Sequence, residues 1–236
     1  MPGVMETSDP INIWLRSERP RAGRQPEHTR ASIVRAALEI ADEDGMEAVS
    51  IRRVASSIGS GAASLYRYVK SHDELVELML DAISGEYELS TTKLGNASPR
   101  RVLLDLAQQG RRIMKKHPWS APLLLSQPSL GPQSLAYLDH ALAALRQTSL
   151  NAAAKLRTVA MLTAVTSAFV QNELSTVSRT TSDAAGRAVY VSKVLATGNY
   201  PALAAVMSEE QLSDNPDDVF HQIIGTYLDG AGLVDS

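Results

Sequence analysis

The chain has 236 residues, 44% of them hydrophobic, and a formal net charge of −3. This is enough for a small domain beside a larger one, and it excludes a wholly disordered chain or a generally basic nucleic-acid coat. The absence of cysteine excludes disulfides, thiolate metal sites and cysteine nucleophiles. The start, MPGVMETSDP, lacks the pattern of a signal peptide, and no run approaches the roughly 18–20 uncharged apolar residues that span a bilayer. We therefore expect a soluble cytoplasmic protein.

Positive charge is concentrated near the N-terminus. Six arginines lie between residues 16 and 35, opposed only by Glu18 and Glu27. Residues 1–26 contain four prolines and show little periodicity. We interpret 1–26 as a flexible basic arm that contacts DNA, since local potential governs such contacts. A disordered tail without a role in binding is the alternative.

From residue 29 onward, apolar residues recur at the spacing of one helix face. The expected helices cover 29–44, 51–58, 62–69, 72–90, 99–117, 119–126, 132–148, 151–177, 183–196 and 216–230. No stretch shows sustained strand alternation, and no repeat of fixed period is present. The sequence therefore predicts an all-α fold, with a DNA-binding domain at 27–74 and a larger helical domain at 75–236.

The short helices expected at 51–58 and 62–69 are joined by the turn GSG at 59–61, where glycine accepts positive φ at little cost. This is a helix-turn-helix arrangement, although many helix hairpins never touch DNA. The second helix, AASLYRYV, presents small residues, a hydroxyl, two phenols and a guanidinium. Such groups can approach base edges closely and bond phosphate oxygens. We predict DNA binding, with a purely structural hairpin as the alternative.

Residues 29–80 resemble the N-terminal domain of the TetR family of bacterial transcriptional regulators. The resemblance rests on a first helix that ends in Asp-Gly, followed by VSIRRVASSIGSGAASLYRYVKSHDELVELM. Two further features resemble the subgroup whose C-terminal half is like that of the tetracycline repressor. They are the segment WLRSERPRAGR, and the sequence HPW followed by a helix that begins at Gly-Pro. The resemblance therefore covers most of the chain. It implies a three-helix DNA-binding domain followed by an effector-binding and dimerisation domain.

The resemblance also implies which positions contact DNA. These positions are Ser50, Arg52, Ala62, Ala63, Ser64, Tyr66, Arg67, Tyr68, Lys70 and His72. Residues 62–64 would face base edges, Arg67 and Tyr68 would contact bases and phosphates, and the others would mainly contact the backbone. Tyr68 replaces the usual histidine. His72 stands where lysine is common, and a neutral imidazole would hold phosphate less well; the arm at 16–30 is the expected substitute.

The C-terminal half carries polar or large, adaptable side chains within apolar helix faces. In the family this combination lines an effector cavity, whereas plain core packing is the alternative for each residue. The candidates are Met79, Met114, His117, Trp119, Tyr137, His140, Met161, Phe169, Gln171 and Asn172. The histidines show no metal-ligand spacing and no catalytic motif is present. We therefore expect no metal, no cofactor and no enzymatic activity.

By resemblance, the helices near 151–177 and 216–230 pair with their twofold mates in a homodimer; burial within one subunit is the alternative. A dimer would bind two half-sites of double-stranded operator DNA about 34 Å apart, or a multiple of that. We expect a repressor that a small-molecule effector releases from a palindromic operator by a population shift. The alternatives are a constitutive DNA-binding protein without an effector and an all-α interaction protein.

Overall fold

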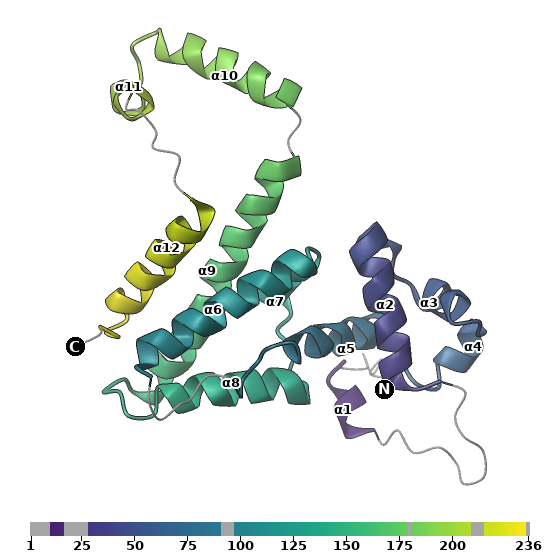
Figure 1. Cartoon of the computed structure of the whole chain (residues 1–236). Helices are drawn as coiled ribbons and strands as arrows, with labels where there is room; N and C mark the ends of the chain where they lie inside the picture. Colours follow the sequence, from purple (N-terminus) through teal and green to yellow (C-terminus); the bar gives the residue numbers. More distant parts are fainter. Residues whose placement is uncertain (1–9, 17–27, 91–96, 179–180, 209–214, 235–236) are drawn as a thin grey trace, which may run out of the picture.

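The computed structural model describes residues 10–16, 28–90, 97–178, 181–208 and 215–234. Within these ranges every regular element is a helix, so the predicted all-α class is confirmed (Figure 1). The elements are α1 (Asn12–Leu15), α2 (Arg30–Asp44), the 3-10 helix η1 (Met46–Ala48), α3 (Ile51–Ser57), α4 (Ala62–Leu65), α5 (His72–Ser84), α6 (Pro99–Lys116), α7 (Ser120–Ser126), α8 (Pro132–Ala144), α9 (Ala152–Ser178), α10 (Thr181–Leu195), α11 (Pro201–Ser208) and α12 (Pro216–Gly230).

Helices α2, α3 and α4 form an N-terminal unit, which we call the head (Figure 1). The Thr29 hydroxyl accepts a hydrogen bond from the Ser32 N–H and caps α2. The Ser50 hydroxyl caps α3 in the same way. Gly59 has φ of 70°, a value that glycine adopts without the strain of a side chain, and it opens the turn into α4. Local capping and turn chemistry thus explain why these short helices begin and end where they do.

Helix α5 joins the head to the rest of the molecule. Its buried face shares one core with the head, in which Val76 and Leu80 belong to the same apolar cluster as Ile33. The expected domain boundary at 74/75 therefore falls inside a continuous helix that packs on both sides. The helix ends at Ser84, earlier than the expected 90.

The remaining helices form a second unit, which we call the body. Helix α6 packs against α9, α8 and α12, and α7 packs against α9. Their shared apolar core includes Leu103, Leu106, Leu162, Phe220 and Leu228. Helix α12 runs beside α9, as Figure 1 shows.

Residues 10–16 differ from the flexible arm that the sequence suggested. They form the short helix α1, whose Ile13 is completely buried in the core of the head. The Trp14 Nε1–H donates to Glu77 Oε1 at 2.7 Å, and Arg16 pairs with the buried Glu74 at 2.5 Å. The flanking parts of the expected arm, 1–9 and 17–26, lie outside the described residues. Tertiary contacts, not local propensity, order this segment.

Replacing Ile13 by alanine is expected to lower the free energy of unfolding by about 2–3 kcal/mol, because it leaves a cavity in the core. Leu15 on the same helix is 82% exposed and supplies the matched control, so Leu15→Ala should leave stability nearly unchanged. Urea unfolding of both variants measures the difference. Equal midpoints for the two variants would show that α1 is not anchored in the core.

Helices α10 and α11 form an arm that stands away from the body in Figure 1. Helix α10 lies within two residues of the expected 183–196, whereas α11 was not expected. The two helices pack against each other, yet both leave large apolar side chains in solvent. These side chains are Val189, Tyr190, Tyr200, Leu203, Val206 and Met207.

Candidate nucleic-acid interface and ligand cavity

The outer surface of the head carries the residues expected to contact DNA. Most of them are exposed, and the rest are partly exposed. The exposed ones are Ser50, Arg52, Ala63, Tyr66, Arg67, Lys70 and His72; the partly exposed ones are Ala62, Ser64 and Tyr68. Leu65 and Val69 face inward and are buried. The structure therefore gathers all ten positions between the cap of α3 and the first residue of α5, while the inward-facing Leu65 and Val69 anchor this segment in the core.

Arg67 is held by Ser64 at the end of α4. Its Nη2 donates to the Ser64 hydroxyl at 2.9 Å, and its Nε donates to the Ser64 carbonyl at 3.4 Å. Both partners lie on the exposed surface, so the guanidinium keeps donors for a base edge or a phosphate. This arrangement gives the exposed guanidinium a preferred orientation beside Ser64.

The charge around His72 is less favourable for DNA. Its Nδ1 lies 3.9 Å from the carboxylate of Asp73, which repels a phosphate. The arginines expected to compensate are not all free to do so. Arg16 pairs with Glu74, and Arg30 donates to the carbonyl of Ile13 at 3.1 Å. The arginines at 19, 21 and 24 lie outside the described residues.

A cavity of about 560 Å³ lies in the body, lined by α5, α6, α7, α8 and α9. This volume falls in the range of pockets that hold drug-sized molecules. Of the ten residues proposed for a ligand, three line it: Met114, Tyr137 and Met161. The cavity is lined mostly by leucine and other apolar side chains, which the sequence alone did not distinguish from ordinary core.

The other seven candidates lie elsewhere. Met79 is buried in the core of the head, and Phe169 packs against Phe220 with ring centroids 5.1 Å apart. His117 and Trp119 lie between head and body. The remaining three, which the cavity lining does not include, are His140, Gln171 and Asn172.

Tyr87 lines the cavity, although the sequence did not single it out. Its ring lies 4.5 Å from that of Tyr137, centroid to centroid, at an interplanar angle of 38°. Burial raises the pKa of both phenols, so both hydroxyls stay neutral near pH 7. The chain has only seven tyrosines and two phenylalanines, and this scarcity of aromatic residues is the only signal that could have drawn attention to Tyr87.

Three buried carboxylates lie along one face of α5, at Glu74, Glu77 and Asp81; we call them the carboxylate row. Glu77 Oε1 accepts from the Ser129 hydroxyl at 2.9 Å and from the Leu130 N–H at 3.1 Å. Asp81 Oδ1 accepts from the N–H groups of residues 133 and 134 at 3.0 and 2.9 Å, and so caps α8. Burial raises the pKa of Asp81.

The carboxylate row connects the cavity to the head. Ser129, Leu130 and Ser134 all line the cavity. Carboxylates of α5 accept hydrogen bonds from the Ser129 hydroxyl and from the backbone N–H groups of Leu130 and Ser134. At the other end of the row, Glu74 accepts from the N–H of Lys70, in the segment between α4 and α5, at 2.7 Å. One helix, α5, thus holds both the cavity wall and the segment that follows α4.

A second polar connection runs from α2 to the body. His117 is buried, and its Nδ1 lies 2.8 Å from Asp42 Oδ1 while its Nε2 lies 3.1 Å from Glu86 Oε1. The Trp119 Nε1–H donates to the same Asp42 oxygen at 2.7 Å. Burial alone would raise the pKa of Glu86, but hydrogen bonds from Lys116 and His117 outweigh it and lower the pKa.

Among the described residues, no group of three or more His, Asp or Glu side chains is placed to hold a metal ion. The candidate site consists of an exposed helix-turn-helix, a mostly apolar cavity, the carboxylate row between them, and the His117 contacts that join α2 to the body.

Comparison with known proteins agrees with this arrangement. Residues 33–79 match the family described as "Bacterial regulatory proteins, tetR family", and residues 91–232 match the "Tetracyclin repressor-like, C-terminal domain". The chain is similar to the HTH-type transcriptional repressor DrrR1 of Streptomyces coeruleorubidus, at 32% identity over 84% of this chain and 75% of that protein. It is also similar to an HTH-type transcriptional regulator of Saccharopolyspora erythraea, at 35% identity over 58% of this chain and 56% of that protein.

Among solved structures, apo ActR from Streptomyces coelicolor superposes with a TM-score of 0.72 at 27% identity, covering 89% of this chain and 99% of ActR. Two family profiles, a relative matched over most of its length and a shared architecture all point the same way. The chain belongs to the TetR family of bacterial regulatory proteins.

Proposed function

We propose that this protein is a cytoplasmic, dimeric repressor that binds a palindromic operator and is released from it by a small-molecule effector. The observation that carries the proposal is the physical connection of an exposed DNA-binding surface to a ligand-sized cavity through α5. Family relationship supports it, since DrrR1 is named a transcriptional repressor and ActR has been crystallised in complex with actinorhodin.

A dimer through α9 and α12 is supported by what these helices leave exposed. The segment Ala152–Thr176 of α9 is long and apolar enough to cross a membrane, yet it packs against α6 and α7. Its exposed residues include the small Ala153 and Ala168, which permit close approach of a second helix. Ile223 on α12 is also exposed.

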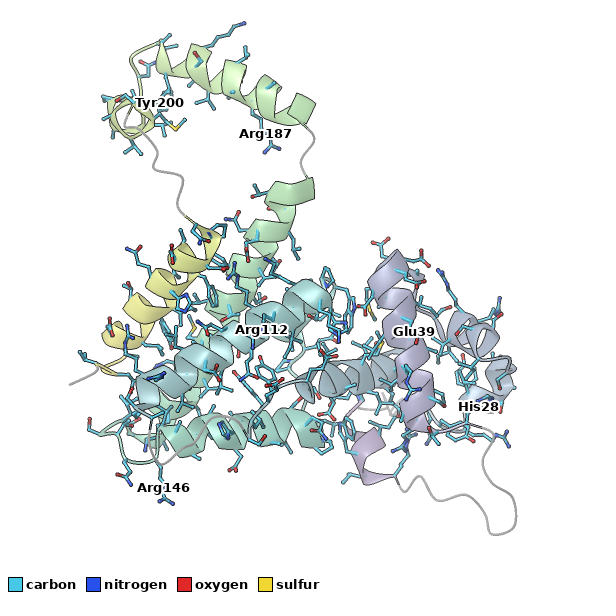
Figure 2. The ribbon with its side chains drawn as sticks, in the orientation of Figure 1. His28, Glu39, Arg112, Arg146, Arg187 and Tyr200 are labelled. Atoms are coloured by element: carbon cyan, nitrogen blue, oxygen red, sulfur yellow. The ribbon has the colours of Figure 1, made fainter. Side chains whose placement is uncertain are left out.

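The exposed apolar surface of α10 and α11 also supports a dimer. Tyr190 is 68% exposed, and Tyr200 lies at the start of α11, away from the body in Figure 2. Soluble proteins seldom leave apolar patches of this kind in solvent, and such a patch usually marks a surface that a partner covers. A second copy of the chain would bury this surface together with that of α9 and α12.

The proposed mechanism is a shift between two spacings of the heads. An effector in the cavity contacts the segment at 129–134, which the carboxylate row ties to α5. A ligand that binds more tightly to one arrangement of this segment favours the head position that goes with that arrangement. The affinity for DNA then falls according to the difference between the ligand's affinities for the two arrangements. The His117 cluster would move with the head because it joins α2 to the body.

The experiment that tests DNA binding compares wild-type protein with Arg67→Ala on operator and scrambled DNA. Loss of the guanidinium is expected to cost about 1–3 kcal/mol of operator binding. Arg146→Ala is the matched control, because Arg146 is exposed at the far end of α8 (Figure 2). Fluorescence anisotropy at several salt concentrations gives both the affinity and the number of phosphate contacts.

Equal binding to both DNAs, unchanged by Arg67→Ala, would contradict the proposal. Binding that barely depends on salt would favour an interaction protein whose helix hairpin is structural. Tight operator binding that no stabilising small molecule reverses would favour a constitutive repressor.

A further inference from the structure

Building on the proposed function, we propose that the cavity takes an uncharged, largely apolar aromatic molecule, which the paired hydroxyls of Tyr87 and Tyr137 recognise through one or two polar groups. The inference depends on what lines the cavity, which polar atoms are already bonded, and how the two rings sit.

The lining excludes a charged ligand. Of the described residues that form the wall, none is Asp, Glu, Lys, Arg or His. Two acids of α5, Glu77 and Asp81, already accept hydrogen bonds from the hydroxyl and N–H groups of the wall segment. A carboxylate, sulfonate or ammonium group in this cavity would lose its hydration without gaining a counter-ion, which costs several kcal/mol.

Most hydroxyl protons at the wall are committed. Ser84 donates to the Leu80 carbonyl at 2.9 Å, Ser129 donates to Glu77 at 2.9 Å, and Thr163 donates to the Val159 carbonyl at 3.3 Å. The two phenols differ. Tyr87 interacts with Tyr137, and Tyr137 also interacts with the Thr163 hydroxyl. Since each phenol has one donor and two acceptor sites, these contacts leave sites unused. They keep capacity for a carbonyl or hydroxyl on the ligand.

The geometry of the tyrosine pair suits an aromatic ring. The two rings are tilted by 38° with centroids 4.5 Å apart, and aromatic pairs of this kind favour offset or edge contacts with a third ring. Gly110 on α6 makes room for this arrangement, because a Cβ at 110 would lie only 2.6 Å from the Tyr87 hydroxyl. Glycine at 110 thus leaves the space that the Tyr87 hydroxyl occupies.

A matched pair of fluorescent probes tests the class. N-phenyl-1-naphthylamine is uncharged, and 8-anilinonaphthalene-1-sulfonate has the same ring system with an added sulfonate. Fluorescence titration of the full chain should give a Kd for the uncharged probe that is lower by at least about tenfold. Tyr137→Phe should weaken the uncharged probe by about fivefold through loss of one hydrogen bond.

Three variants locate the probe. Ala164→Phe fills the cavity and Gly110→Ala displaces Tyr87, so each should weaken the uncharged probe by about tenfold or more. Ala143→Phe adds the same bulk at an exposed position of α8 and should have no effect. Circular dichroism checks folding, and Gly110→Ala serves as the smaller change if Ala164→Phe fails to fold.

Equal affinity for the two probes, or tighter binding of the sulfonate, would overturn the inference. Binding of the uncharged probe that neither Gly110→Ala nor Ala164→Phe alters would overturn it as well. If uncharged aromatic probes bind as expected but never release operator DNA, the effector part of the proposed function fails and the ligand class stands. If a charged compound releases the DNA through this cavity, the class fails and the proposed function stands.

Discussion

Replacing Arg111 by alanine is expected to lower the free energy of unfolding by about 3–5 kcal/mol, because it removes one partner of a largely buried ion pair. Arg111 donates to both oxygens of Glu173 at 2.8 and 2.7 Å and to Asp217 at 2.7 Å. Its guanidinium also lies 5.3 Å from the Phe169 ring centroid and 5.0 Å from that of Phe220. One side chain thus holds α6, α9 and α12 together.

The same variant should change how stability depends on pH. Hydrogen bonds from Arg111 are the largest cause that lowers the pKa of Glu173 in the folded protein. A lowered folded pKa adds stability above the unfolded pKa of the carboxyl, near 4.5, and this stability is lost as pH falls through the lower folded value. Wild-type protein should therefore lose stability below about pH 4.5 more steeply than Arg111→Ala.

Arg112→Ala provides the control for both effects. Arg112 is the next residue on α6 and is exposed, as Figure 2 shows. Its removal should change unfolding by less than about 0.5 kcal/mol. Urea unfolding between pH 3 and 7 measures all three proteins, and equal losses for the two arginine variants would contradict the buried role of Arg111.

The second large effect is expected at Glu77. Glu77→Ala leaves three donors without their acceptor: the Trp14 indole, the Ser129 hydroxyl and the Leu130 N–H. A buried donor left without an acceptor costs about 1–3 kcal/mol. Because water reaches some of the three, we expect the free energy of unfolding to fall by roughly 3 kcal/mol in total. The variant should also weaken coupling between cavity and head, so that an effector releases less operator DNA.

Glu77→Gln keeps an acceptor oxygen and should recover part of the loss. Asp73→Ala is the matched control for stability on the same helix, because Asp73 is 72% exposed and contributes to stability through the helix dipole by about 0.3–1 kcal/mol. Thermal unfolding measures stability, and operator release at saturating ligand measures coupling. A Glu77→Ala protein as stable as Asp73→Ala, with full release, would contradict the role of the carboxylate row.

The head could be predicted closely from sequence because its determinants are local. Ser50 caps α3, Gly59 opens the turn, and Leu65 and Val69 face inward. Capping, glycine turns and helical periodicity each act within a few residues. The fold class and the family followed from the same local features.

The links between head and body could not be predicted in this way. Glu77 and Asp81 look like solvent-facing charges on a helix, and only the segment folded against α5 buries them. Ile13 and Trp14 lie in a proline-containing stretch without periodicity, yet long-range contacts order them as α1. Such placements depend on tertiary packing, which local propensity does not encode.

The sequence predicted a cavity in the body, but only three of the ten residues that it named line the cavity. Met114, Tyr137 and Met161 line it, whereas Phe169 turns toward Arg111 and Phe220. A large side chain on an apolar helix stripe can face a cavity or a neighbouring helix, and periodicity does not separate the two. The rotation of each helix in the finished bundle decides which face meets the cavity.

Footprinting on the DNA beside the protein's own gene tests the central claim most directly. The account predicts protection of a palindrome whose half-sites lie about 34 Å apart, or a multiple of that, and loss of protection when an uncharged aromatic effector fills the cavity. Arg67→Ala should weaken the footprint, whereas Arg146→Ala should not. No protected palindrome, or protection equal to that on scrambled DNA, would contradict the account.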